Sequence, residues 1–225
     1  MGFLAQIKKD PAGAIAEKMF QYRVKWTLFW GTRRTYFSAK LKGVKVGQRA
    51  RFFGRPLIRR APLSTIKIGD DAVFRSSFHT NLVGLNRKCL LATAYEGAEI
   101  RIGNNAGLSG TVIGAAESVV LGDDVLCGAN VLVTDFDWHP VDPNRRRERA
   151  DSKPVVIEDN VWLGVNSIVL KGVRIGRNSV IAANSVVVKD IPANVIAGGN
   201  PAKVIKQLDA EQVAQAELRY AAMSS

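Results

Sequence analysis

Two histidines, His79 and His139, are the side chains of this 225-residue chain best suited to move a proton at neutral pH. An imidazole has an unperturbed pKa of about 6.5, so it can act as a general base for a hydroxyl, which is otherwise a poor nucleophile. His139 follows two carboxylates and a tryptophan in the run Asp-Phe-Asp-Trp-His-Pro, residues 135–140. An isolated histidine is more often structural than catalytic, so its context has to decide its role.

Other reactive groups are few. The two cysteines, Cys89 and Cys127, cannot build a disulfide framework, and Cys127 falls on a repeated aliphatic position, where a small core residue is expected. No His/Cys cluster has metal-ligand spacing, and no glycine loop of the phosphate-binding type is present. The sequence therefore predicts chemistry without a metal.

The element that must position these groups is a six-residue repeat. An aliphatic residue recurs at every sixth position: Ile157, Leu163, Val169, Ile175, Ile181 and Val187. This period fits neither a helix nor a lone amphipathic strand, but it fits a short strand followed by a tight turn. Three such units close a triangular coil, and Gly-Asn and Asp-Asn pairs supply the turns. The repeat predicts a parallel β-helix.

Two segments interrupt the repeat. Residues 76–99 keep no clear hexad, and we expect a distorted coil or an inserted loop there. Residues 134–154 form a polar excursion between coils that begins just before His139. A loop this long without structure of its own is usually functional or disordered.

The chain has a basic N-terminal arm. Residues 1–43 read as a helical arm in which aromatic and basic residues alternate, and residues 207–225 read as a C-terminal helix. The net charge is +12, and residues 1–60 contain 15 Lys and Arg against 2 Asp and Glu, so the excess charge is confined to the start of the chain. A membrane surface is the favoured partner of the arm, ahead of packing on its own oligomer; binding of nucleic acid is the least favoured.

The composition is that of a globular protein, with 47% hydrophobic and 23% charged residues. No stretch approaches the roughly 20 apolar residues of a membrane span, and no signal peptide is recognisable. We therefore expect a cytoplasmic protein, in peripheral contact with the inner face of the membrane through residues 1–43.

Four segments together identify a family resemblance: residues 130–140 around His139, 153–164, 183–192 and 197–205. They resemble the hexapeptide-repeat acyltransferases, in particular the maltose/galactoside O-acetyltransferase-like branch. The resemblance is close over residues 95–206 and loose over 44–94. It implies that residues 44–206 form a left-handed β-helix domain and that the protein is a homotrimer.

The resemblance also implies a mechanism. His139 would deprotonate the acceptor hydroxyl, which would attack acetyl-CoA directly. Asp135 and Asp137 would support the imidazole, or instead cap the loop or touch the acceptor. Trp138 would stack on a sugar or simply pack. Ser109 falls where several relatives have Asn, which favours a polysaccharide or glycolipid precursor over a simple sugar as acceptor.

The same resemblance places the co-substrate, acetyl-CoA. Its pantetheine arm would run along a groove lined by Val165, Ala183, Val188 and Lys189, partly between subunits. Lys203 and Lys206 would approach the nucleotide phosphates, or else form a solvated edge of the last coil.

The sequence thus predicts an acetyl-CoA-dependent sugar O-acetyltransferase that takes part in making a cell-surface polysaccharide or glycolipid. Two alternatives stay open. One is N-acetylation of an amino-sugar on the same scaffold, and the other is a non-catalytic β-helical scaffold held to a membrane or partner by its basic arm.

Overall fold

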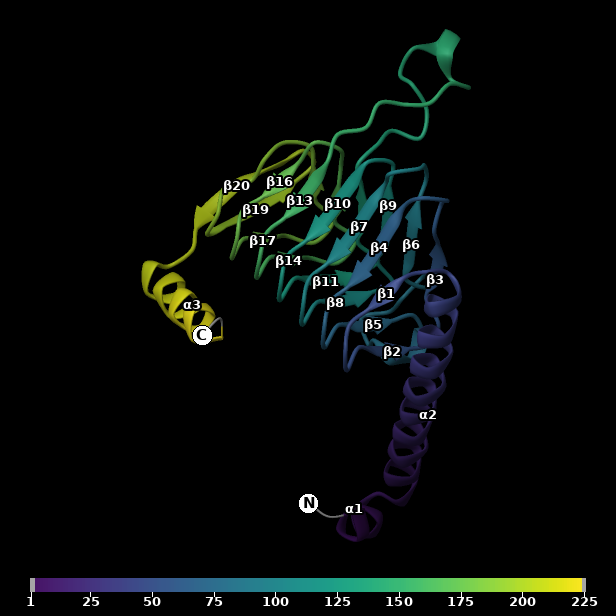
Figure 1. The fold of residues 1–225 in the computed structure, drawn as a ribbon. Helices are drawn as coiled ribbons and strands as arrows, with labels where there is room; N and C mark the ends of the chain where they lie inside the picture. The colour runs from purple at the N-terminus through teal and green to yellow at the C-terminus, as the bar shows by residue number, and fades with distance from the viewer. Residues whose placement is uncertain (1–2, 224–225) are drawn as a thin grey trace.

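The computed structural model describes residues 3–223, with side chains described from 6 to 218, so the ends of the predicted segments 1–43 and 207–225 lie outside it. A parallel β-helix built of three sheets occupies residues 45–207, with helices at both ends (Figure 1). The predicted arm consists of two helices, α1 (Phe3–Lys9) and α2 (Pro11–Leu41). The predicted C-terminal helix is α3 (Ala210–Met223).

Each sheet contributes one strand to each of the first six coils, and the second sheet continues with β19 and β20. The first sheet contains β1 (Lys45–Val46), β4 (Thr65–Ile68), β7 (Glu99–Ile102), β10 (Ser118–Leu121), β13 (Val155–Ile157) and β16 (Arg174–Ile175). The second contains β2 (Arg51–Phe53), β5 (Val73–Arg75), β8 (Gly107–Ser109), β11 (Leu126–Ala129), β14 (Trp162–Leu163), β17 (Val180–Ile181), β19 (Val195–Gly199) and β20 (Ala202–Gln207). The third contains β3 (Leu57–Arg59), β6 (Leu90–Thr93), β9 (Val112–Ala115), β12 (Leu132–Thr134), β15 (Ile168–Val169) and β18 (Val186–Val187). All pairings are parallel except that of β19 with β20.

The register confirms the predicted repeat. Ile157 pairs with Ile175 one coil later, and Leu163 pairs with Ile181 in the same way. All six predicted aliphatic residues are fully buried, so they form columns inside the coil. Burial of these columns is the main source of stability, because each coil buries its apolar face only against its neighbours.

The turns use asparagine as expected. Asn160, Asn166, Asn178 and Asn184 all have φ between 56° and 61°, the left-handed region that Asn tolerates well. Their side chains also join successive coils, since the amide of Asn160 donates to Asn178 at 2.9 Å. The same residues therefore shape the corner and tie one coil to the next.

Residues 76–99 contain an inserted loop, one of the two structures predicted for this segment, and a regular strand follows it. A short 3₁₀ turn, Phe78–Thr80, and a loop interrupt the coil, but β6 returns to regular pairing with β3 and β9. Leu91 in β6 is fully buried. The inserted loop shifts the phase of the repeat, so the strand after it no longer keeps a six-residue spacing with the strands before it.

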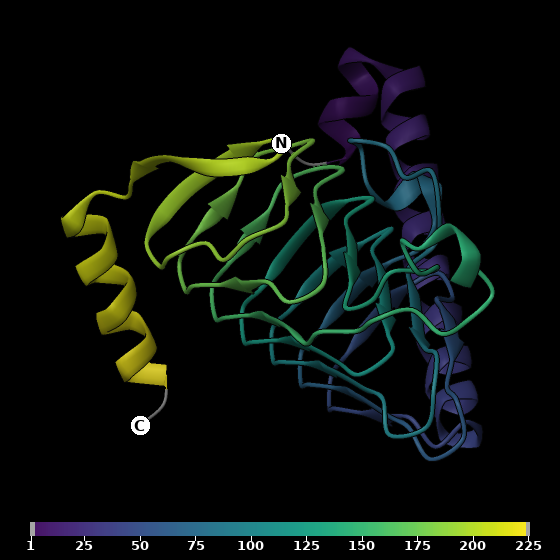
Figure 2. The same ribbon diagram turned by 90° about the horizontal axis from the view of Figure 1, so that it is seen from above.

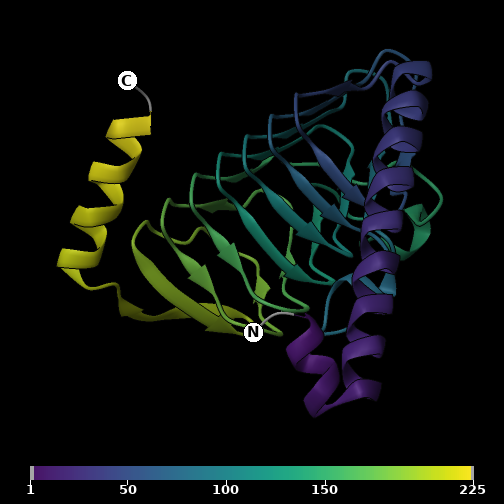
Figure 3. The ribbon, with the colours of Figure 1, turned by 90° about the horizontal axis from the view of Figure 1, so that it is seen from below.

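The C-terminal half of α2 closes the first coil (Figure 3). A Cβ on Gly31 would lie 2.3 Å from the carbonyl oxygen of Phe52, so only glycine allows this approach of helix to strand. The hydroxyl of Thr32 accepts from the backbone N–H of Phe52 at 3.1 Å, and the Tyr36 hydroxyl donates to the carbonyl of Gly47 at 2.6 Å. Such a cap shields the open end of a solenoid. Over the described residues, each helix is too short or too polar to cross a lipid bilayer.

Candidate functional site

His139 lies exposed on the long loop that leaves β12, which stands out from the coils in Figures 1 and 2. Its Nδ1 is 2.9 Å from the carbonyl oxygen of Arg146, across the 3₁₀ turn Pro143–Arg145. A carbonyl oxygen can only accept a hydrogen bond, so in neutral His139 the proton is on Nδ1 and Nε2 has the lone pair. The loop therefore fixes the tautomer in which Nε2 can act as a base.

Asp135 anchors the start of this loop. It is fully buried, and its carboxylate accepts three backbone N–H groups, from Ala116 (2.7 Å), Glu117 (2.8 Å) and Ser118 (2.6 Å). Burial raises the pKa of Asp135, and the three N–H donors oppose that rise. Of the roles expected for Asp135, which were support of the imidazole, capping of the loop and contact with the acceptor, the buried carboxylate and its three N–H donors fit capping of the loop.

Asp137 and Trp138 have different surroundings. The carboxylate of Asp137 pairs with the ammonium of Lys171 at 2.6 Å, so it ties the loop to the following coil. Trp138 packs on Phe136, with ring centroids 4.6 Å apart, yet it leaves 61% of its surface exposed. Lys171 was missed at the sequence level, where it is one lysine among many in an ordinary turn.

Ser109 lies at a different corner of the coil. It ends β8 and leads into the third sheet, whereas the His139 loop leaves that sheet. Val165 and Ala183 lie at the same corner as Ser109, in later coils, where the N–H of Asn184 donates to the Val165 carbonyl at 2.8 Å. A shallow hollow beside Ser109 is also lined by Arg75, Gly128 and Trp162.

The remaining predicted residues fall elsewhere. Val188 and Lys189 follow β18, at the corner from which the His139 loop leaves, and both are exposed. Lys203 and Lys206 are exposed on β20 at the last edge of the second sheet. Apart from Lys203 and Lys206, the candidate residues of one chain lie at two corners, with the third sheet between His139 and Ser109.

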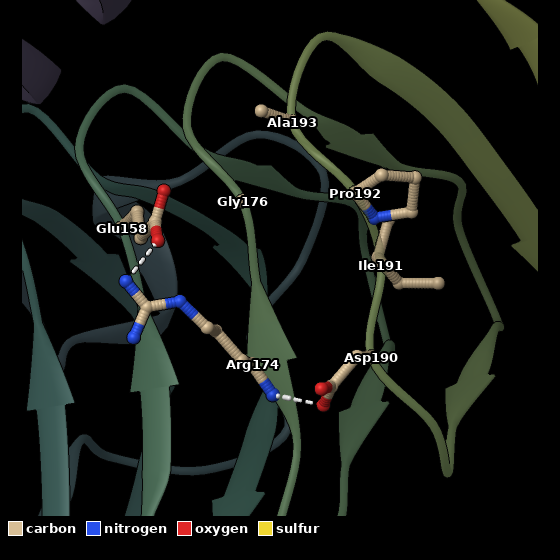
Figure 4. A pocket seen from close by; sticks show the side chains of 7 residues that line it. All are labelled: Glu158, Arg174, Gly176, Asp190, Ile191, Pro192 and Ala193. Carbon is tan, nitrogen blue, oxygen red and sulfur yellow. Dashed lines mark hydrogen bonds and ion pairs between the residues drawn. The ribbon is translucent and has the colours of Figure 1, made fainter.

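Another hollow, drawn in Figure 4, lies over the end of the first sheet. The Arg174 guanidinium pairs with Glu158, and the Arg174 backbone N–H donates to Asp190 at 2.7 Å. These charges satisfy one another, so we assign no chemistry to the hollow. Among the described residues, no three His, Cys, Asp or Glu side chains gather as metal ligands would.

Comparisons with known proteins agree with this architecture. A family model for the hexapeptide repeat of succinyl-transferase matches residues 154–189. A galactoside O-acetyltransferase of Lactococcus lactis is 38% identical over 144 residues, which cover 64% of this chain and 63% of that protein. A 2,3,4,5-tetrahydropyridine-2,6-dicarboxylate N-acetyltransferase of Clostridium perfringens is 52% identical over 62 residues, 28% of this chain and 26% of that protein.

A solved structure of a galactoside acetyltransferase in complex with coenzyme A shares the fold. Its TM-score is 0.54 at 24% identity, and the match covers 95% of this chain and 94% of that one. The predicted fold class, a left-handed parallel β-helix with a helix at each end, is confirmed. The chain spans less than two thirds of the length of the curated relatives it matches.

Proposed function

Because the chain belongs to the hexapeptide-repeat acyltransferases, we propose that it is an acetyl-CoA-dependent O-acetyltransferase acting on a sugar hydroxyl. The observation that supports this most directly is the hydrogen bond from His139 Nδ1 to the Arg146 carbonyl, which leaves Nε2 free to take a proton. The galactoside O-acetyltransferase relative supports the acceptor class.

In the proposed reaction, Nε2 of His139 takes the proton of the acceptor hydroxyl. The oxygen attacks the thioester carbonyl, the bond from carbon to sulfur breaks, and the proton passes from His139 to the leaving CoA thiolate. Backbone N–H groups would stabilise the tetrahedral oxyanion. The products are an O-acetyl sugar and CoA.

We place the substrates on the two corners that hold the candidate residues. Trp138 and Asp137 would meet the acceptor, with Ser109 contributed from the other corner. Val165, Ala183, Val188 and Lys189 would line the pantetheine arm, and Lys203 and Lys206 would meet the phosphates. Since the third sheet separates His139 from Ser109, a complete site needs a neighbouring copy, which a homotrimer would supply.

The acceptor we propose is a precursor of a cell-surface polysaccharide or glycolipid. Ser109 supports this choice because its hydroxyl reaches less far than the amide of the Asn that the family resemblance leads one to expect there. A cytoplasmic location is consistent with two cysteines that are both free thiols.

N-acetylation of an amino-sugar is the second candidate, favoured by the N-acetyltransferase relative that is 52% identical over 62 residues. A neutral amine attacks a thioester with less help from a base than a hydroxyl needs. Loss of the His139 imidazole would therefore slow N-acetylation much less than O-acetylation.

The test is release of free thiol from acetyl-CoA by the full chain, with sugars, amino-sugars and nucleotide sugars as acceptors. We expect release that depends on an acceptor with a free hydroxyl and leaves an alkali-labile ester on the product. Release only with amines, giving an alkali-stable amide, would favour the second candidate. No release with any acceptor, together with no calorimetric binding of CoA, would favour the non-catalytic scaffold.

A further inference from the structure

An exposed apolar stripe runs along α2. Seven large side chains recur at spacings of mostly three or four residues, and each exposes between 38% and 68% of its surface: Ile15, Met19, Tyr22, Trp26, Phe29, Trp30 and Phe37. Residues at these spacings lie on one face of a helix. By helical position Arg33 lies on the same face between Trp30 and Phe37, with its guanidinium 4.8 Å from the ring centroid of Phe29. Exposed apolar patches on a protein surface mark interaction sites.

The stripe points away from the protein's own β-helix. Thr35 and Ala39 are buried against the first coil. Trp26 precedes Thr35, and Trp30 precedes Ala39, by nine residues in each case, which is two and a half helical turns. By this spacing the two tryptophans face away from Thr35 and Ala39, although both also border a hollow beside Gly54 and Arg55. Figures 1 and 3 show the N-terminal half of α2 extending beyond the coils.

Basic residues border the stripe on both sides. Lys25 lies along one border and Arg23 and Arg34 along the other, by their helical positions. In the described part of the chain, none of these three forms an ion pair with a carboxylate. The Arg34 guanidinium lies 5.3 Å from the ring centroid of Trp30.

A hollow beside the stripe adds a site for an anion. It lies between α2 and the segment that follows β2, and its lining includes Trp26, Trp30, Arg34 and Arg55. Two guanidinium groups beside two indole rings suit a phosphate group attached to an apolar tail.

We propose that the outer face of α2 docks on an anionic phospholipid bilayer, with the apolar stripe in the headgroup boundary, the basic borders against lipid phosphates and the hollow holding one headgroup. Aromatic residues at the centre of a helix with Lys and Arg along its borders match this geometry. A second copy of α2 fits less well, because antiparallel or parallel pairing would bring basic borders of like charge together. The inference does not depend on the proposed enzymatic activity.

The test is sedimentation of the full chain with vesicles of phosphatidylglycerol and phosphatidylcholine, and with vesicles of phosphatidylcholine alone. We expect binding to the anionic vesicles that weakens with added salt. The double variant Trp26→Ser/Phe37→Ser should weaken it roughly tenfold or more. The double variant Lys25→Gln/Arg34→Gln should weaken it about tenfold, whereas the charge-matched control Lys67→Gln/Arg101→Gln on the first sheet should not.

Circular dichroism shows whether the serine and glutamine variants stay folded. A second measurement, fluorescence quenching in the unaltered chain, does not depend on those variants. Lipids with brominated acyl chains should quench its indole fluorescence, and quenching should fall in Trp26→Phe/Trp30→Phe. Absent or salt-independent binding, or equal quenching in that variant, would overturn the proposal. So would loss of the native oligomer in Trp26→Ser/Phe37→Ser, which would assign the stripe to a second copy.

Discussion

Within the His139 loop, two acidic residues of the same sequence motif differ in what they do. Asp135 is buried beneath three backbone N–H donors, whereas Asp137 is half-exposed and paired with Lys171. The motif identified His139 as the candidate base, but it could not separate the two aspartates. Their roles depend on which backbone N–H groups and which lysine approach from neighbouring coils, and that information lies outside the motif.

Asp135→Asn should destabilise the protein by about 2–4 kcal/mol, because the amide NH₂ would face backbone donors that a carboxylate now satisfies. Urea unfolding measures the loss. Asp137→Asn is the matched control, and its surface ion pair should cost no more than about 1 kcal/mol. Equal losses in the two variants would contradict the capping role of Asp135.

The β-helix itself could be predicted from the sequence. The packing of α2 on its first coil and the shift of the repeat before β6 could not. Six aliphatic residues in phase and Asn at the turns follow directly from the repeat, since each hexad needs one interior side chain and one tight corner. The phase shift before β6 and the seating of α2 depend on contacts between distant segments. Gly31, for example, gives no sequence signal that it lies against Phe52.

Gly31→Ala tests how α2 caps the first coil. In an exposed helix this change stabilises by about 1 kcal/mol, but here the new methyl group would overlap the Phe52 carbonyl oxygen and the Gly54 N–H. We expect a loss of about 1–3 kcal/mol instead. Thermal unfolding followed by circular dichroism gives the sign, and a raised melting temperature would show that the helix does not approach the strand so closely.

Across the whole molecule, neither the basic charge nor the candidate site residues are evenly distributed. The excess of basic over acidic residues lies within residues 1–60, and the candidate site is divided between two corners of one chain. The uneven distribution of charge could be counted directly from the sequence. The division of the candidate site follows only from the order of the strands around the coil. Ser109 and His139 both belong to the predicted site, yet the third sheet lies between them.

The core predicts a pH dependence of stability. Burial raises the pKa of Cys127 to about 12 from an ordinary value of about 9. The unfolded thiol therefore loses its proton at lower pH than the folded one, and the unfolding free energy falls as pH rises from about 9 toward 12. Measured against Cys127→Ala, which lacks this ionisation, the wild-type chain should lose relative stability across that range. If the difference in unfolding free energy between wild type and Cys127→Ala stayed constant with pH, the raised pKa of the buried Cys127 thiol would be contradicted.

The most direct test of the proposed function compares the wild type with His139→Ala in acceptor-dependent release of CoA. We expect the turnover rate with a sugar hydroxyl to fall about 10²–10⁴-fold in His139→Ala, because the general base is lost. Calorimetric affinity for CoA should stay unchanged, since the residues proposed to bind CoA lie outside the His139 loop. A variant that transfers acetyl groups to hydroxyls at the wild-type rate would show that His139 is not the base.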